Sequence, residues 1–236
     1  DRCVRLLDAA KAAGADAAKL QCYTPDELVH LRGDGPAPEP WGSQGYTMRT
    51  LYERAQTPFP WFMVLYDHAE RIGLPLFSSV FGMQSLALLE SVGNPVYKIS
   101  HFEYGMKWLL DAVRATGKPM IVSVPKPYPL HGADLSLYCP GSYPCATEDV
   151  HLDTVYRFGE SPRGGMGDSP GTPHGLSSHC LDPLLPIAAV ALGAQMIEMH
   201  FHLESEPSEL EANVSINERQ FADMVSAVRR TEAMLR

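Results

Sequence analysis

The residues best suited to chemistry lie near the C-terminal end of the chain. Residues 195–203 alternate between apolar side chains and polar ones, among them Glu198 and His200. Ser177 and His179 show the same i, i+2 spacing at the end of an earlier segment. Because successive side chains of a strand point to opposite faces, each pair lies on one face. Two such strands joined by one helix lie side by side in parallel, which brings His179 and His200 together at their C-terminal ends. This pattern predicts a two-histidine metal site, with a structural role for both imidazoles as the alternative.

Other polar residues fall at or near the ends of expected strands. A lysine on a short buried strand is costly unless it is paired or binds an anion. Lys19 and Lys98, together with several serines, therefore indicate an anion-binding floor suited to phosphate or carboxylate. The alternative is that both lysines pair with Glu198 and Glu103, although buried ion pairs often fail to offset their own desolvation. The full set is Lys19, Gln21, Ser78, Ser79, Lys98, Ser100, Ser123, Ser177, His179, Glu198 and His200.

Composition and charge exclude several kinds of partner. The 236 residues carry a formal net charge of −9, which argues against nucleic acid as the main partner. No apolar run approaches the roughly 18–20 residues needed to span a bilayer, and no signal peptide is visible, so we expect no membrane partner. The five cysteines lack C-x-x-C or secreted disulfide spacing, which indicates reduced thiols in a cytoplasmic protein. Cys180 follows His179 directly, but adjacent strand residues point to opposite sides, which argues against a metal-binding or nucleophilic role.

Strands and helices alternate along the chain, and glycines close most of the helices. This rhythm predicts a parallel sheet, and the length suits a single (β/α)8 TIM-barrel domain over residues 1–236. A closed barrel needs eight strands, and the chain opens on a helix over residues 2–13, so we expect a first strand upstream. Seven strands are expected, at 16–22, 74–79, 95–100, 119–124, 135–139, 174–178 and 195–203.

Three further segments have distinct characters. Residues 23–45 are rich in proline and glycine, which favours a functional loop over a site. Residues 159–173 contain several glycines and prolines and are expected to form a flexible surface insertion. Residues 216–235 have the spacing of an amphipathic final helix.

A set of short motifs resembles one known family in the order of its signature. The motifs are Ala17-Ala-Lys-Leu-Gln-Cys, Phe77-Ser-Ser-Val-Phe, Tyr97-Lys-Ile-Ser, Gly117-Lys-Pro-Met-Ile-Val-Ser, Gly175-Leu-Ser-Ser-His, Pro186-Ile-Ala-Ala-Val-Ala-Leu-Gly-Ala and Ile197-Glu-Met-His-Phe. They are similar to those of the N-acetylneuraminate (sialic acid) synthase family, and the likeness runs over nearly the whole chain.

The resemblance implies a (β/α)8 barrel that condenses phosphoenolpyruvate with an N-acylated aldose such as N-acetylmannosamine, giving a 2-keto acid and phosphate. It implies a divalent cation, Mn²⁺ or Mg²⁺, held by His179 and His200, with Glu198 beside them as a third catalytic residue. It also implies a homodimer. The positions that match the phosphoenolpyruvate site are Lys19, Ser79, Lys98, Ser123 and Ser177, and those that match the sugar site are Gln21 and Tyr143.

Several positions depart from the family pattern. His101 replaces a phosphate-contacting serine, Ser178 replaces an aspartate beside the metal, and Ser142 replaces a sugar-contacting asparagine. The family's Gly-Pro-Asp-His after the last strand is Glu209-Leu-Glu-Ala212. We also expect the protein to lack the C-terminal antifreeze-like domain that often completes the sugar site. Because the sugar positions differ more than the others, we expect an acceptor other than the standard N-acetylmannosamine. A catalytically degenerate barrel that acts as a binding or assembly subunit is the main alternative, and a metal-dependent hydrolase or isomerase is a further one.

Overall fold

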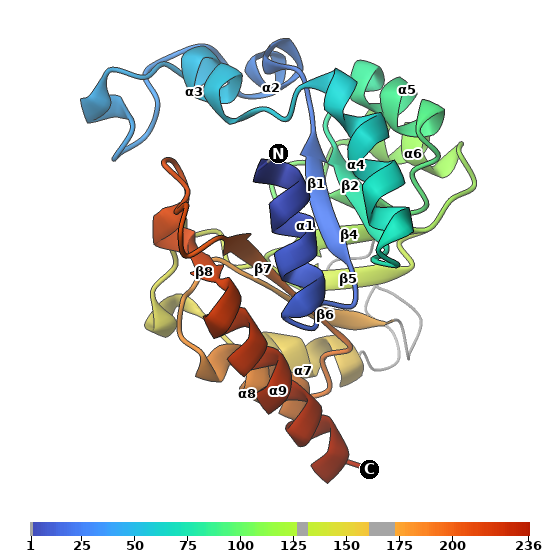
Figure 1. Cartoon of the computed structure of the whole chain (residues 1–236), viewed down its shortest axis with the longest axis vertical. Coiled ribbons are helices and arrows are strands. Elements are labelled where there is room, and N and C mark those ends of the chain that lie inside the picture. Colours follow the sequence, from blue (N-terminus) through green and yellow to red (C-terminus); the bar gives the residue numbers. More distant parts are fainter. Residues whose placement is uncertain (1, 127–131, 161–172) are drawn as a thin grey trace.

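Eight parallel strands form one curved sheet in which each strand pairs with the next along the chain. The computed structural model describes residues 2–126, 132–160 and 173–236. Figure 1 shows the strands curving around a common interior, and this arrangement confirms the α/β barrel class. The strands are β1 Ala18–Cys22, β2 Leu76–Val80, β3 Tyr97–Ile99, β4 Met120–Val124, β5 Leu135–Tyr138, β6 His174–Ser178, β7 Met196–His202 and β8 Ser215–Asn217.

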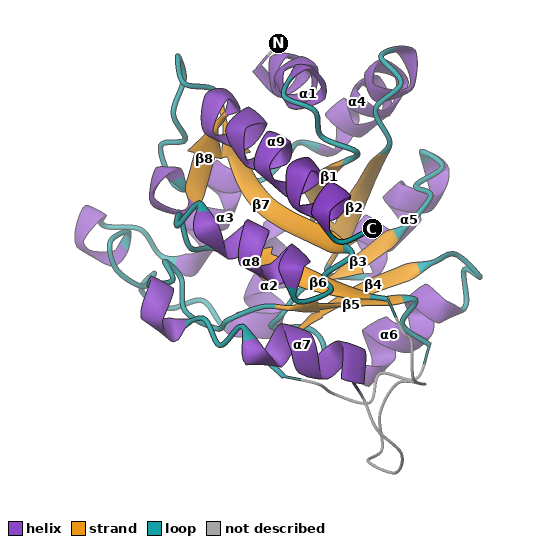
Figure 2. Ribbon diagram, turned by 90° about the horizontal axis from the view of Figure 1, so that it is seen from below, coloured by secondary structure: helices purple, strands orange, loops and turns teal. Residues whose placement is uncertain are grey.

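Helices cover the outer side of this sheet (Figure 2). The covering helices are α1 Arg2–Ala12, α4 Phe59–Arg71, α5 Met83–Ser91, α6 Lys107–Arg114, α7 Asp153–Glu160, α8 Leu184–Ala191 and α9 Glu218–Met234. Between helix and strand the chain reverses at glycines such as Gly73, whose φ of 65° is readily adopted only by a residue without a β-carbon. The largest core cluster packs α4, α5, α6 and α8 against the strands between them, and none of the described helices is long and apolar enough to cross a membrane.

The strand Ser215–Asn217 (β8) was not among the expected strands. It pairs with the C-terminal half of β7, with His200 opposite Ser215 and His202 opposite Asn217. This segment was predicted to be a polar linker followed by the start of the final helix, and that prediction is wrong. Asn217 is also the N-cap of α9 and its side chain accepts a hydrogen bond from the backbone of Gln220, so the local signal is that of a helix start.

The sheet is open between its first and last strands. Among the described residues no strand pairing joins β8 or β7 to β1. A cavity of about 540 Å³ lies at this opening, between α1 and β1 on one side and β7 and α9 on the other. Its lining includes Lys19, Glu198 and His200, so the opening reaches the polar interior. The expected upstream strand concerns residues before Asp1 and stays a prediction.

The segment between β1 and α4 holds short helices rather than the long loop expected for residues 23–45. It contains α2 Pro25–Arg32, the 3-10 turn η1 Gly42–Gln44 and α3 Met48–Ala55, and Figure 1 shows it beyond the C-terminal end of β1. Thr24 caps α2 in a reciprocal capping box with Glu27. The other Glu27 oxygen accepts from the backbone nitrogens of Gln84 and Ser85 at 2.9 and 3.1 Å, which ties α2 to the start of α5. Most of the expected insertion 159–173 lies outside the described residues.

Candidate functional site

Glu198 on β7 is the centre of a buried polar cluster. One of its carboxylate oxygens accepts hydrogen bonds from Lys19 Nζ at 2.9 Å, Lys98 Nζ at 3.1 Å and Ser177 Oγ at 2.9 Å. Burial alone would raise the pKa of Glu198, but the charges of Lys19 and Lys98 overcome it, so the pKa lies far below its usual range. Burial lowers the pKa of Lys98, and the Glu198 charge opposes that effect. The carboxyl group is therefore an acceptor and a negative charge, and not a proton donor.

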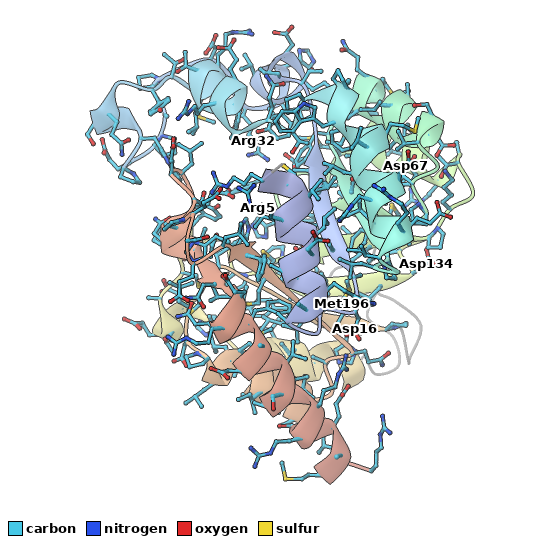
Figure 3. All side chains as sticks on the ribbon, viewed as in Figure 1. Arg5, Asp16, Arg32, Asp67, Asp134 and Met196 are labelled. Atoms are coloured by element: carbon cyan, nitrogen blue, oxygen red, sulfur yellow. The ribbon has the colours of Figure 1, made fainter. Side chains whose placement is uncertain are left out.

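Two lysines share one carboxylate, which leaves a surplus of positive charge in this cluster. The alternative, in which Lys19 and Lys98 pair with Glu198 and Glu103, is therefore confirmed for Glu198 and wrong for Glu103. Glu103 is fully buried, and one of its oxygens accepts a hydrogen bond from Arg32 at 2.6 Å. Figure 3 labels Arg32 near α2. A surplus cation beside buried hydroxyl groups suits a small anion.

Buried hydroxyl groups line the same side of the sheet. Ser79 on β2 and Ser123 on β4 are each 1% exposed, and both lie at positions predicted for phosphoenolpyruvate binding. Ser123 Oγ has no hydrogen-bond partner in the described part of the chain. An orphaned buried hydroxyl costs free energy, so a polar ligand at this point would satisfy it.

His179 and His200 meet at the C-terminal ends of β6 and β7, as their spacing predicts. Their ring centroids lie 5.1 Å apart, and the Tyr143 ring lies 4.7 Å from His179 and 6.0 Å from His200. Burial and the neighbouring His200 lower the pKa of His179 to about 3, so its imidazole is neutral at physiological pH. Neutral imidazole is the form that binds metal ions.

Glu211 was not among the residues predicted for the site, yet its carboxylate faces both His200 and Tyr143. Its oxygens lie 2.6 Å from Tyr143 Oη and 3.4 Å from His200 Nδ1. Burial would raise the pKa of Glu211, but hydrogen bonds from His200 and Tyr143 lower it to about 2. Glu211 lies in the irregular loop after β7, where no periodic pattern could have indicated its direction. The only sequence signal was its place in a segment that departs from the family motif.

The remaining candidates lie at the edge of this group. Gln21 is exposed at the open side of β1 and lies opposite Ser79 in the strand register. His202 has a buried Nδ1 atom without a hydrogen-bond partner among the described residues. Cys180 is buried, and its sulfur lies 3.7 Å from Thr147 Oγ1.

The donor set can be tested for a divalent cation. Within the described ranges, no group of three or more histidine, cysteine, aspartate or glutamate side chains is arranged to hold a metal ion. His179 and His200 nevertheless supply two imidazoles that face each other, and His179 Nδ1 is buried without a partner. Two protein nitrogens leave positions for water and substrate oxygens, as catalytic metal sites require. The residues present therefore fit a catalytic cation, and not a closed structural one.

Comparison with known proteins places this chain in a family. The model of the NeuB family matches residues 6–126 and 132–236. The chain belongs to the NeuB family. Membership identifies it as a condensing synthase of the sialic- and pseudaminic-acid type.

Relatives of this NeuB-family chain carry names of three related synthases. It is 32% identical over 241 residues to pseudaminic acid synthase of Helicobacter pylori, covering 95% of this chain and 68% of the relative. It is 28% identical to N,N'-diacetyllegionaminic acid synthase of Legionella pneumophila, covering 98% and 67%, and 26% identical to N-acetylneuraminate-9-phosphate synthase of Homo sapiens, covering 98% and 66%. The chain thus spans about two thirds of the length of each.

Solved structures agree on the fold. N-acetylneuraminic acid synthetase from Leptospira borgpetersenii superposes with a TM-score of 0.81 at 22% identity, covering 99% of this chain and 79% of that one. The spore coat polysaccharide biosynthesis protein SpsE from Bacillus subtilis superposes with a TM-score of 0.79 at 26% identity, covering 100% and 64%. The NeuB-family chain therefore has the sheet architecture of this group.

Proposed function

We propose that the chain condenses phosphoenolpyruvate with an N-acylated aldose to give a 2-keto acid and inorganic phosphate. The observation that carries the proposal is the buried cluster of Lys19, Lys98 and Glu198 beside the His179–His200 pair, at one end of the sheet. Family membership supports this class of reaction.

The cationic cluster suits the first substrate. Phosphoenolpyruvate carries a phosphate and a carboxylate, and Lys19 and Lys98 offer one positive charge more than Glu198 neutralises. Ser79, Ser123 and Ser177 add hydroxyl donors at the same face of the sheet. In a site with little water these charge-assisted hydrogen bonds are stronger than in solution.

The reaction joins two carbon atoms and breaks one carbon–oxygen bond. Carbon 3 of phosphoenolpyruvate attacks the aldehyde carbon of the open-chain sugar, and positive charge develops on carbon 2. The ionised Glu198 stabilises that charge from within the cluster. Water then adds to carbon 2, and the tetrahedral intermediate expels phosphate, so that one water is consumed for each phosphate released.

The histidine pair and Tyr143 form the acceptor end of the site. When bound at His179 and His200, Mn²⁺ or Mg²⁺ would act as a Lewis acid toward the aldehyde oxygen. Tyr143 lies against both imidazoles, and Gln21 is exposed at the adjoining edge of β1, so both are placed to contact a sugar.

The acceptor is expected to differ from N-acetylmannosamine. Ser142 stands where the family pattern has a sugar-contacting asparagine, and identity is higher to pseudaminic acid synthase, at 32%, than to N-acetylneuraminate-9-phosphate synthase, at 26%. The name of another relative, N,N'-diacetyllegionaminic acid synthase, specifies two N-acetyl groups, and we therefore infer that an aldose with two acylamino groups is the preferred acceptor.

The test measures phosphate release from phosphoenolpyruvate with Mn²⁺ and a panel of aldoses that carry one or two acetamido groups. Lys98→Met should reduce turnover by at least about 100-fold, since each lost charge contact costs about 1.5–3 kcal/mol and this lysine makes several. Lys107→Met is the matched control, because Lys107 is exposed on α6 and, among the described residues, is paired with Asp111 alone. Chelation of the metal should stop turnover, and Mn²⁺ should restore it.

Two results would contradict the proposal. Unchanged turnover in a folded Lys98→Met variant would remove the cationic cluster from the mechanism. Binding of phosphoenolpyruvate by calorimetry with no phosphate release for any acceptor would favour the binding or assembly subunit instead.

A further inference from the structure

The Glu211 carboxylate connects two side chains that the proposed reaction uses. One oxygen accepts the Tyr143 hydroxyl at 2.6 Å, and the other faces His200 Nδ1 at 3.4 Å. The backbone nitrogen of Glu211 donates to Ser208 Oγ at 2.9 Å, which fixes the start of this turn. Hydrogen bonds to both the side chain and the backbone therefore hold Glu211 in place.

A carboxylate beside Nδ1 decides which nitrogen of an imidazole carries the proton. A neutral imidazole has one donor and one acceptor nitrogen, and the hydrogen bond to a carboxylate places the proton on the near one. For His200 the nitrogen nearest the carboxylate is Nδ1, at 3.4 Å, and Nε2 lies on the far side of the ring. His179 differs, since its buried Nδ1 has no hydrogen-bond partner within the described residues.

Contacts from the helical segment between β1 and α4 hold the Glu211 loop over the site. Trp41 Nε1 donates to the carbonyl of Leu210 at 3.2 Å, and the Trp41 ring lies 6.3 Å from that of Tyr143. Arg54 on α3 pairs with Glu209 in the same loop. The loop is thus attached at the two residues that precede Glu211.

We propose that Glu211 is a positioning residue that holds His200 with its Nδ1 protonated and its Nε2 directed to a divalent cation, and that aligns Tyr143 beside it. The proposal rests on the proposed function, because it assumes a cation at the histidine pair. A carboxylate behind a ligating histidine orients the ring and raises its basicity, and its loss typically weakens metal binding by about 10–100-fold.

The first experiment measures the Mn²⁺ dissociation constant of the full chain by electron paramagnetic resonance, without substrates. Glu211→Ala should weaken binding by about 10–100-fold, and Glu211→Gln, which keeps an oxygen acceptor, should recover part of the loss. Glu70→Ala, which removes an exposed carboxylate of α4, is the matched control and should bind as the wild type does. Tyr143→Phe removes only the other contact of Glu211 and should have a smaller effect than Glu211→Ala. Equal Mn²⁺ affinity in folded Glu211→Ala and wild type overturns the proposal.

The second experiment uses the metal-free protein, so that it does not depend on the proposed function. The nitrogen chemical shifts of His200 should show the Nδ1–H form in the wild type and in Glu70→Ala, and a mixture of tautomers in Glu211→Ala. A mixture in the wild type overturns the positioning role. An Nδ1–H form in a wild type that binds no Mn²⁺ supports the positioning role and counts against the proposed function instead.

Discussion

The closed side and the open edge of the sheet differ in how they hold their polar residues. On β2, β4 and β6 every residue is buried, whereas every residue of β7 is only partly buried and Gln21 on β1 is exposed. Lys98, Ser123 and Ser177 belong to the closed side, and Lys19 and His200 to the open edge. Glu198 projects from the open edge and binds residues of both.

This difference separates two tasks within one site. Groups on the closed side are packed on all sides, so they are rigid before any ligand arrives and suit a small anion of fixed shape. Groups on the open edge border the cavity of about 540 Å³ and can meet a larger molecule. In the proposed reaction the closed side would hold phosphoenolpyruvate and the open edge would receive the sugar.

The largest effect is expected from removing the charge of Glu198, whose carboxylate joins the closed side of the sheet to the open edge. Glu198→Gln leaves Lys98, which is 1% exposed, without a negative partner. We expect a loss of about 3–5 kcal/mol in the free energy of unfolding, because an uncompensated buried charge is strongly destabilising. Urea unfolding followed by circular dichroism measures it.

The matched change on the surface is Glu209→Gln, whose partner Arg54 is exposed, and it should lower the free energy of unfolding far less than Glu198→Gln does. Equal losses for Glu198→Gln and Glu209→Gln would show that the buried cluster is well solvated, which would remove the distinction between the two sides.

Two leucines test the same difference between the closed side and the open edge through packing alone. Leu176 on β6 is 0% exposed, whereas Leu20 on β1 is only partly buried beside the opening. Leu176→Ala should cost about 2–5 kcal/mol, because the closed core cannot relax into the space left behind. Leu20→Ala should cost about 1–2 kcal/mol, since less apolar area is lost. Chemical unfolding of both variants provides the test, and a larger loss for Leu20→Ala would mean that the edge is packed as tightly as the core.

Sequence patterns predicted the closed side better than the open edge, for physical reasons. Buried strands repeat apolar residues with a clear period, and glycines such as Gly73 and Gly117 mark where each helix ends. The meeting of His179 and His200 followed from strand alternation and one connecting helix. The shared use of Glu198 by both lysines could not be deduced, because it depends on side chains from three strands.

The features that sequence patterns missed all lie in short or irregular segments. Strand β8 has three residues, which is too short for the two-residue alternation of a strand to be recognised. Helix α2 begins at Pro25 within a stretch rich in proline and glycine, where the capping pair Thr24 and Glu27 was the better signal. Glu211 lies in a loop, and only the folded chain shows that it points to His200.

The smallest effect is expected where β8 meets α9 at the open edge. Asn217 ends the strand and caps the helix, and its side chain accepts the backbone N–H of Gln220 at 2.9 Å. Asn217→Ala should lower the free energy of unfolding by about 1 kcal/mol, the usual cost of losing an N-cap. Because β8 pairs only with β7 among the described strands, the loss should appear first as faster amide hydrogen exchange in the first turn of α9 and in β8. Exchange in β4 should change only as far as global stability falls. Uniform acceleration throughout the sheet would instead show that the edge unfolds together with the closed side, as one cooperative unit.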